Sequence, residues 1–445
     1  MSETVPAFWS ELSLSELLVS DSFFCDGDWV ESRDQDVEGT NRLIQLADIG
    51  DGRFLDKSNR FMNDAQFARL RCTALSQGDI LIARMPDPIG RACIFPAMNM
   101  RCATVVDVAI LRNAKADPLW LVAAINSDSF RRSIEINSCG TTRTRISRSF
   151  LSGLRLIVPP LETQKSIAKI IGRIDTVIEK TEALIDKYQQ IQTGLMHDLF
   201  TRGVLPNGQL RPSHDEAPEM YQRAAIGWIP KEWKLKDASM VLESVADGPF
   251  GSNLKTEHYV VDPGVRVVRL QNVVKHEYND GDKAYVSDRH AAFLVRNKVV
   301  GGDVLIAGLG EDRYPVGRAC TYPEYLPPAI NKADCFRARC VSGVMQNKFF
   351  MLFLNSELAR RQIRRYEQGV TRPRINTGNL KRLIVGVPSI NEQIAIIERF
   401  EAAQANIHRQ QASVENLKAQ KLGLMQDLLT GKVPVMINAP ETADA

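Results

Sequence analysis

Two stretches of the chain carry the same long-period hydrophobic pattern. Apolar side chains recur at alternating spacings of four and three residues, the a and d positions of a heptad. The first stripe consists of Ile167, Ile171, Ile174, Ile178, Ile185, Tyr188, Leu195 and Leu199, and the second of Ile396, Phe400, Ile407, Val414, Leu417, Leu424 and Leu428. Thr181 and Gln192 interrupt the first stripe where Gln410 and Lys421 interrupt the second. The pattern predicts two coiled-coil helices, over residues 159–202 and 388–431.

Each apolar stripe could pack only against its own domain. Because the two stripes match, we expect the helices to pair with each other. An antiparallel pair would hold a globular domain at each end, and 35 residues would make a rod of roughly 50 Å. Ser389 and Glu392 have the spacing of a capping box at the start of the second helix.

The matching stripes are part of a repeat that organises the chain. Residues 140–204 align with 369–433 without a gap, with 20 identities in 65 positions. Upstream, Gly-Asp at 78–79 recurs at 302–303, Gly-Arg-Ala-Cys at 90–93 recurs at 317–320, and Asn-Ser at 126–127 recurs at 355–356. The second copy is longer by a net five residues, three of them where "RMPDPI" is replaced by "GLGEDRYPV". A shared framework with divergent loops suggests one architecture with two recognition surfaces.

The globular parts alternate short β-type runs with helical ones, such as "GDILIAR" and "WLVAAINSDSFRRSI" in the first copy. We therefore expect an α+β fold with two mixed α/β domains in tandem and a pseudo-twofold relation. The expected boundaries are domain one at 1–158, the first long helix at 159–202, a linker at 203–229, domain two at 230–387, the second long helix at 388–431 and a disordered tail at 432–445. Trp9 and Trp233 are expected in the cores.

Composition excludes several classes of protein. The chain has 445 residues, no apolar run long enough to span a bilayer and an N-terminus unlike a signal peptide. Its eight cysteines form no CxxC pair, which favours reduced thiols in a cytoplasmic protein over a metal site. The net charge is only +3, but arginines cluster: residues 359–383 hold eight Arg or Lys and one acid, and residues 130–156 hold six Arg and one acid. Such clusters are typical of phosphate-binding surfaces, although a solvated charged face is the alternative.

No catalytic motif has the required spacing. The chain lacks a GxxxxGK[ST] phosphate loop, HExxH, GxSxG and the Asn-Pro-Pro-aromatic tetrapeptide of amino-methyltransferases. We therefore expect a binding subunit without a catalytic residue or metal site of its own.

Taken together, the motifs resemble those of the specificity subunit of Type I restriction–modification enzymes over nearly the whole chain. The resemblance rests on "IGWIPKEWKLKDA", "DGPFGSNLK", "DGDWVESRDQ", both GDxLIA runs, the paired stretches "GTTRTRIS" (140–147) and "GVTRPRIN" (369–376), and GLMxDLxT at both helix ends. It implies two target-recognition domains that each read half of a bipartite DNA target, with helices that fix the unread spacer. It also implies two modification subunits and restriction subunits as partners, with S-adenosylmethionine, ATP and Mg²⁺ bound by those partners.

The recurring stretch suggests which residues contact DNA. Domains that read different half-sites would share backbone contacts and differ in base contacts. We therefore expect the recurring residues to bind phosphates or brace the recognition loop; the alternative is that the arginines pair with carboxylates of their own domain. These residues are Thr142, Arg143, Arg145, Thr371, Arg372 and Arg374. Base readers are expected in the divergent parts, among Arg84, Arg91 with the 85–89 loop, Arg313, Arg318 and Lys332. Lys255 in "DGPFGSNLK" is a further DNA-binding candidate, or part of a plain turn.

Two other functions stay open. A coiled-coil scaffold with protein partners only would show no steep loss of DNA affinity with salt, whereas phosphate neutralisation requires one. An enzyme of a combined restriction type would need motifs that this chain lacks.

Overall fold

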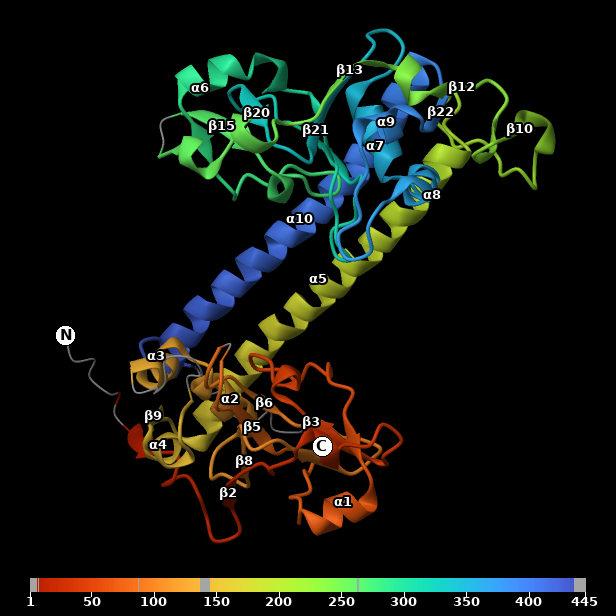
Figure 1. Cartoon of the computed structure of the whole chain (residues 1–445). Helices are drawn as coiled ribbons and strands as arrows, with labels where there is room; N and C mark the ends of the chain where they lie inside the picture. Colours follow the sequence, from red (N-terminus) through yellow and green to blue (C-terminus); the bar gives the residue numbers. More distant parts are fainter. Residues whose placement is uncertain (1–5, 7, 87, 137–144, 262–263, 436–445) are drawn as a thin grey trace. The chain divides into compact units, whose positions relative to one another are not determined.

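The computed structural model describes residue 6 and residues 8–86, 88–136, 145–261 and 264–435. The chain divides into two compact units. The first unit comprises residues 1–183 and 411–445, and the second comprises residues 184–410. Each unit contains one globular domain and a part of both long helices, α5 (Leu161–Thr201) and α10 (Ile390–Leu429), which Figure 1 draws in yellow and blue.

The first unit is a mixed α/β domain built on three small sheets. β1 (Ser10–Ser13) pairs with β9 (Arg155–Val158), the strand that leads into α5. The main sheet is antiparallel, in the order β2 (Phe23–Asp26), β8 (Val108–Arg112), β5 (Ile80–Ala83) and β6 (Ala92–Ile94). The third sheet has the order β4 (Phe61–Met62), β3 (Asn41–Ile44) and β7 (Cys102–Thr104). The helices are α1 (Asp64–Arg69), α2 (Pro118–Ile125), α3 (Asp128–Ile136) and α4 (Arg148–Gly153), with 3-10 turns at Ser32–Asp34 and Leu46–Asp48.

The second unit repeats this plan. β12 (Lys234–Asp237) pairs with β22 (Ile384–Val387), the strand that leads into α10. The main sheet has the order β13 (Leu242–Ala246), β21 (Cys335–Cys340), β18 (Val304–Ala307) and β19 (Ala319–Thr321). The other sheet has five strands, in the order β14 (Tyr259–Val260), β16 (Tyr285–Val286), β15 (Val265–Val268), β20 (Ala329–Asn331) and β17 (Lys298–Val299). The helices are α6 (Asp288–Phe293), α7 (Asn347–Asn355), α8 (Glu357–Tyr366) and α9 (Thr377–Lys381), with 3-10 turns at Ala238–Met240, Gly251–Asn253, Thr256–His258, Leu270–Asn272 and Val295–Asn297.

Corresponding elements confirm that the sequence repeat is a repeat of structure. In the first unit Ile80 of β5 stands opposite Leu111 of β8, and in the second Val304 of β18 stands opposite Ala338 of β21, the equivalent positions. The repeated glycines have a structural reason: Gly78 and Gly302 have φ of 91° and 82°, a region that favours glycine. The repeated Asn126 and Asn355 each use the side-chain amide to bond both backbone groups of the β6 or β19 residue opposite, Ala92 or Ala319.

The two long helices pair with each other, as the matching heptads predict, and they run antiparallel. In the first unit Lys421 lies 2.6 Å from Asp175 and Lys418 lies 3.1 Å from Glu182, so the numbers rise along α5 as they fall along α10. In the second unit the seam residue Gln192 donates to Gln404 at 2.5 Å. All the apolar residues of the two heptad stripes, which form the seam between the helices, are buried or half-buried. Their stripes also pack on their own domains, because Ile167 and Ile171 share a core with Ile80 and Trp120. The apolar stripes therefore contact both the other long helix and their own domain, the two alternatives considered from the sequence.

The segment expected as a polar linker is folded. Residues 203–229 contain a 3-10 turn at Pro218–Met220 and the strand β10 (Tyr221–Ala224), which pairs with β11 (Gly227–Pro230). Val204, Ile226 and Ile229 belong to the main core of the second unit. Of the expected tail, residues 436–445 lie outside the described residues, whereas Val435 packs on the core of the first unit.

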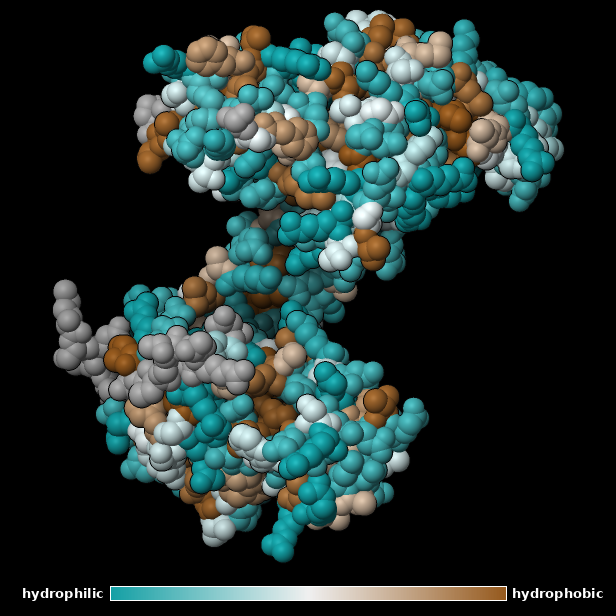
Figure 2. Space-filling model, viewed as in Figure 1, coloured by the Kyte–Doolittle hydropathy of each residue, from teal (hydrophilic) through white to brown (hydrophobic). Residues whose placement is uncertain are grey.

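The surface is mostly hydrophilic on the face that Figure 2 shows, with hydrophobic residues scattered over it. Within the described ranges, none of the helices combines the length and the apolar character needed to cross a bilayer.

Candidate nucleic-acid interface

The recurring arginine stretch forms a tight turn in the second unit. Gln368 and Arg374 exchange backbone hydrogen bonds of 3.0 and 2.8 Å, and Gly369 between them has φ of 90°. The turn exposes its tip, where Val370, Thr371 and Arg372 are exposed to solvent. The equivalent tip in the first unit, with Thr142 and Arg143, lies outside the described residues.

The second arginine of each stretch braces its loop. Arg374 Nη2 lies 2.9 Å from Asp334 Oδ2, and Arg145 Nη2 lies 3.0 Å from Asp107 Oδ1. The next residue bonds to the same strand end in both units, Ile375 N to Gly308 O and Ile146 N to Arg84 O, both at 3.0 Å. Arg145 and Arg374 thus follow the alternative left open from the sequence, an ion pair with a carboxylate of their own domain, and their half-exposed side chains leave room for a second contact.

A cavity of about 370 Å³ lies beside the exposed tip of the turn. Its walls are the turn around Leu270–Val274, the longer divergent loop Leu309–Tyr314, and Arg372. Gln271, Asn279, Glu311 and Arg372 line it, and these residue types are the ones that recognise base edges. Arg313 is exposed on the same loop, with its guanidinium carbon 5.4 Å from the Tyr314 ring centroid.

Two predicted base readers, Arg91 and Arg318, are framework residues instead. Both are buried, with 7% and 6% exposure, and both donate to backbone carbonyls. Arg91 donates to Leu46, Ile49, Met85 and Pro88, and Arg318 donates to Leu270, Val273, Leu309, Tyr314 and Pro315. The base-reading prediction for these two residues is wrong, because their donors hold the divergent loop against the neighbouring turn.

Arg84 is also misassigned as a base reader. It is 5% exposed, and its guanidinium donates to Ile146 O at 2.9 Å and forms an ion pair with Asp26. The positive charge of Arg84 is therefore paired with a carboxylate of its own domain.

The two lysine candidates lie near the "DGPFGSNLK" loop. Lys332 is half-buried, with its ammonium 5.3 Å from the Tyr259 ring centroid, and Lys255 is exposed, 3.6 Å from Glu257. Gly248 explains part of the motif, because a Cβ there would stand 1.9 Å from the Lys332 carbonyl carbon. The first unit repeats this approach, since a Cβ on Gly27 would stand 2.2 Å from Val105 O.

Asp247 precedes that glycine and is electrostatically unusual. Its carboxylate accepts the backbone N–H groups of Gly248 at 2.7 Å and Asp334 at 3.1 Å. Burial, followed by the neighbouring Asp334 charge, raises the pKa of Asp247 to about 6. Asp247 therefore ties the "DGPFGSNLK" loop to the strand end that also holds Arg374.

Sequence reasoning missed the acidic partners, Asp107 and Asp334. They stand at equivalent places in the repeat, 227 residues apart, as do the Gly-Arg-Ala-Cys runs. That recurrence was a usable signal, because a carboxylate that recurs with an arginine suggests a pair.

The thiols and acids of the described ranges offer no metal site: no group of three or more His, Cys, Asp or Glu is arranged to hold an ion there. Burial raises the pKa of Cys93, Cys335 and Cys340 to about 12, so these thiols stay protonated.

Known proteins similar to this chain include specificity subunits of Type I restriction enzymes. Residues 55–190 match the family model of the Type I restriction modification DNA specificity domain. The chain is 24% identical over 328 residues to the Type I restriction enzyme MjaVIII specificity subunit of Methanocaldococcus jannaschii, covering 73% of this chain and 72% of the relative. It is also 24% identical over 416 residues to the putative MjaX specificity subunit of the same organism, covering 88% and 87%.

A solved structure shares the fold over the full length. One chain from a study of complex assembly and conformational transition of the type I R-M system matches with a TM-score of 0.56 and 13% identity, covering 97% of this chain and all of that chain. The structural likeness concerns the fold, whereas the match to a DNA specificity domain rests on residues 55–190. The resemblance inferred from the sequence is confirmed: the family model matches part of the chain, and the relatives similar to most of its length are named as specificity subunits of Type I restriction enzymes.

Proposed function

We propose that this chain is a non-catalytic subunit whose two domains each read one half of a bipartite DNA target. The observation that carries the proposal is the pairing of a repeated framework with an unrepeated loop. Arg91 and Arg318 make the same contacts in the two units, while the loop that they hold differs in sequence and length. Two copies of one scaffold with different loops suit two different half-sites.

The recurring turn would position the DNA rather than read it. Its tip exposes Arg372 and Thr371, whose equivalents recur in the first copy as Arg143 and Thr142. Contacts common to both half-sites are contacts to phosphates, since base contacts must differ. In the second domain, base recognition would fall to the cavity wall formed by Gln271, Asn279 and Glu311, with Arg313 on the loop beside it.

The paired helices would set the spacer between the half-sites and dock two methyltransferase subunits. Support comes from the contact between the helices, which is apolar at most heptad positions, and from their antiparallel direction in each unit. The chain would need no cofactor of its own. S-adenosylmethionine would be bound by the modification subunits, and ATP and Mg²⁺ by the restriction subunits.

The test is the pattern of methylated adenine in the genome of the host, with and without this gene. We expect a bipartite motif of two half-sites with an unread spacer, which disappears on deletion. An unchanged methylation pattern, together with no duplex binding by the purified chain at low salt, would favour a coiled-coil scaffold with protein partners only.

A further inference from the structure

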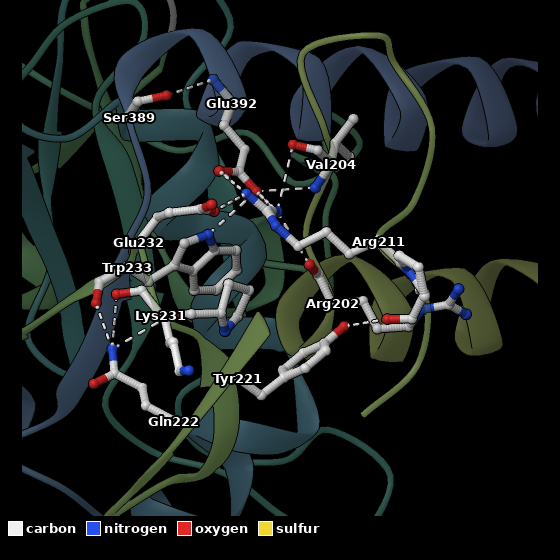
Figure 3. Close-up of polar contacts among 12 residues, drawn as sticks. Arg202, Val204, Arg211, Tyr221, Gln222, Lys231, Glu232, Trp233, Ser389 and Glu392 are labelled. Carbon is white, nitrogen blue, oxygen red and sulfur yellow. Dashed lines mark hydrogen bonds and ion pairs between the residues drawn. The ribbon is translucent and has the colours of Figure 1, made fainter. Parts of the chain in front are cut away.

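The chain folds back on itself where it passes from α5 towards the second domain. Figure 3 shows that Arg211 and Trp233 both point at the carboxylate of Glu392, in the first turn of α10. Residues 203–211 thus lie against the start of the helix that pairs with α5. Ser389 caps that helix through its hydroxyl, 3.3 Å from Glu392 N, while the Glu392 carboxylate is directed to the preceding segment.

Four donors converge on this one carboxylate. Glu392 Oε1 accepts from Val204 N at 2.9 Å, from Trp233 Nε1 at 3.1 Å and from Arg211 Nη1, while Oε2 accepts from Arg211 Nη2 at 3.2 Å. The ion pair is nearly dry, since the side chains of Arg211 and Glu392 are 4% and 9% exposed. Two turns further along α10, Arg399 donates to the carbonyl of Gly208.

Arg211 also holds the end of α5. Its Nη1 donates to the carbonyl of Arg202 at 3.1 Å, and Arg202 Nε donates to the carbonyl of Arg211 at 2.7 Å. One guanidinium thus bonds the backbone that leaves α5 and the first turn of α10 at the same time. We call Arg211, Trp233 and Glu392 the register clamp.

A glycine makes the close approach to the carboxylate possible. Gly203 has φ of 67°, and a Cβ there would stand 2.2 Å from Glu392 Oε1 and 2.6 Å from Arg211 Nη1. Any side chain at this position would push the two charged groups aside.

The clamp exists in one copy of the repeat only. The first-copy equivalent of Glu392 is Thr163, and that of Trp233 is Trp9. Thr163 carries no carboxylate, so the first unit cannot form this ion pair. The contact is therefore not part of the shared framework of the two domains.

A buried ion pair is a poor source of stability but a good specifier of register, because desolvation offsets its attraction while a misaligned state leaves a charge unpaired. Apolar heptads alone tolerate slippage. A slip of one helical turn is roughly 5.4 Å, more than the rise of about 3.4 Å between base pairs.

We propose that the register clamp fixes the alignment of α10 on α5 and thereby restricts the target to one spacer length. This inference rests on the proposed function, in which the helices set the spacer. Arg211, Trp233 and Glu392 act as positioning residues and touch no DNA.

The test compares Gly203→Ala with Gly208→Ala in the full-length chain. Gly208 has φ of 82° and nothing within 4 Å of a built Cβ, so its substitution imposes similar backbone strain without touching the carboxylate. The probes are duplexes that carry both half-sites of the host methylation motif, separated by the native spacer or by one base pair more or less. Because Gly203→Ala could impair folding, the charge-free pair Arg211→Met with Glu392→Gln is the second variant.

We expect wild type and Gly208→Ala to prefer the native spacer by about tenfold or more. Gly203→Ala and the double variant should lose most of this preference, with the half-site sequences unchanged. If both keep it and only melt at a lower temperature, the clamp is merely structural and the inference is overturned. A change in a half-site sequence would overturn it as well. Absence of any spacer preference in the wild type would instead refute the proposed function.

Discussion

At the scale of single residues, the sequence does not show whether an arginine in or beside a divergent loop is exposed or buried. Arg313 and Arg318 lie five residues apart, yet one is exposed and the other donates to five carbonyls in the interior. Burial lowers the pKa of Arg318, the sign expected for a cation removed from water. Its neighbours compensate through carbonyl dipoles rather than through a carboxylate.

Removing that buried guanidinium should destabilise the second unit. Arg318→Ala leaves several carbonyls without a donor, which we expect to lower the free energy of unfolding by about 3 kcal/mol or more. Arg313→Ala is the matched control, because its side chain is exposed. Denaturant unfolding of both variants checks this, and equal stability of the two would contradict the framework role.

Arg372, at the exposed tip of the turn, should act on all DNA sequences alike. We expect Arg372→Ala, and its first-copy equivalent Arg143→Ala, to weaken duplex binding uniformly and to reduce the slope of log affinity against log salt by about one. Competition between duplexes with single base changes provides the measurement. A selective change at one base position would show that the arginine reads bases.

Asp247 should make stability depend on pH. Its pKa of about 6 in the folded state lies above the ordinary 3.8, so the folded state binds more protons between these values. This contribution to stability is therefore present at low pH and is lost as pH rises from about 4 through about 6. Asp247→Asn keeps an oxygen for the two N–H donors and removes the titration. The melting temperature of wild type minus that of the variant should fall across this window; a flat difference would contradict the assignment.

Sequence alone showed which residues recur but not which are buried. Arg91 and Arg318 were predicted as base readers because they border loops that differ, and the carbonyls that they satisfy are invisible in sequence. Arg145 and Arg374 could have been paired with Asp107 and Asp334, since both members recur at equivalent places.

At the scale of elements, the long helices were predictable because fifteen apolar positions repeat one spacing, whereas the fold of residues 203–229 was not. Its two strands have four residues each, too few for an alternating pattern to stand out. Its contacts also depend on Glu392, far along the chain, whose carboxylate the sequence assigns to a capping box.

Lengthening the rod should change the spacer alone. One heptad inserted after Ala183 and one after Gln410, where the two units meet in sequence, would add about 10 Å, or about three base pairs. We expect the methylated motif to keep both half-sites and gain a longer spacer. A three-residue insertion at each site is the control, because it breaks the heptad phase. A motif with altered half-sites would contradict the proposal that the paired helices set the spacer length.

At the scale of the whole molecule, net charge contributes little to DNA binding. With a formal charge of +3 over 445 residues, attraction to DNA must come from local clusters. Those clusters are partly neutralised within the domain, since Arg361 and Arg364 both lie within 4 Å of Glu357. The salt dependence of DNA binding should therefore depend on those Arg and Lys side chains that are exposed and not neutralised by a neighbouring acid.

We expect affinity for a target duplex to fall about a thousandfold or more between 50 and 200 mM salt if six or more phosphates are contacted. Fluorescence anisotropy with the full-length chain measures this. A duplex that lacks one half-site is the control for non-specific binding. Affinity that is independent of salt would favour the scaffold function.

Arg91 and Arg318 have a consequence for how such proteins change over time. Each guanidinium donates hydrogen bonds to carbonyls at both ends of its loop. These contacts form in both copies, although the loop of the second copy is three residues longer. The buried arginine contacts are thus the same in both copies although the loops differ in sequence and length. Under the proposed function, this arrangement would separate heritable change in target choice from the risk of misfolding, and new specificities could arise one loop at a time.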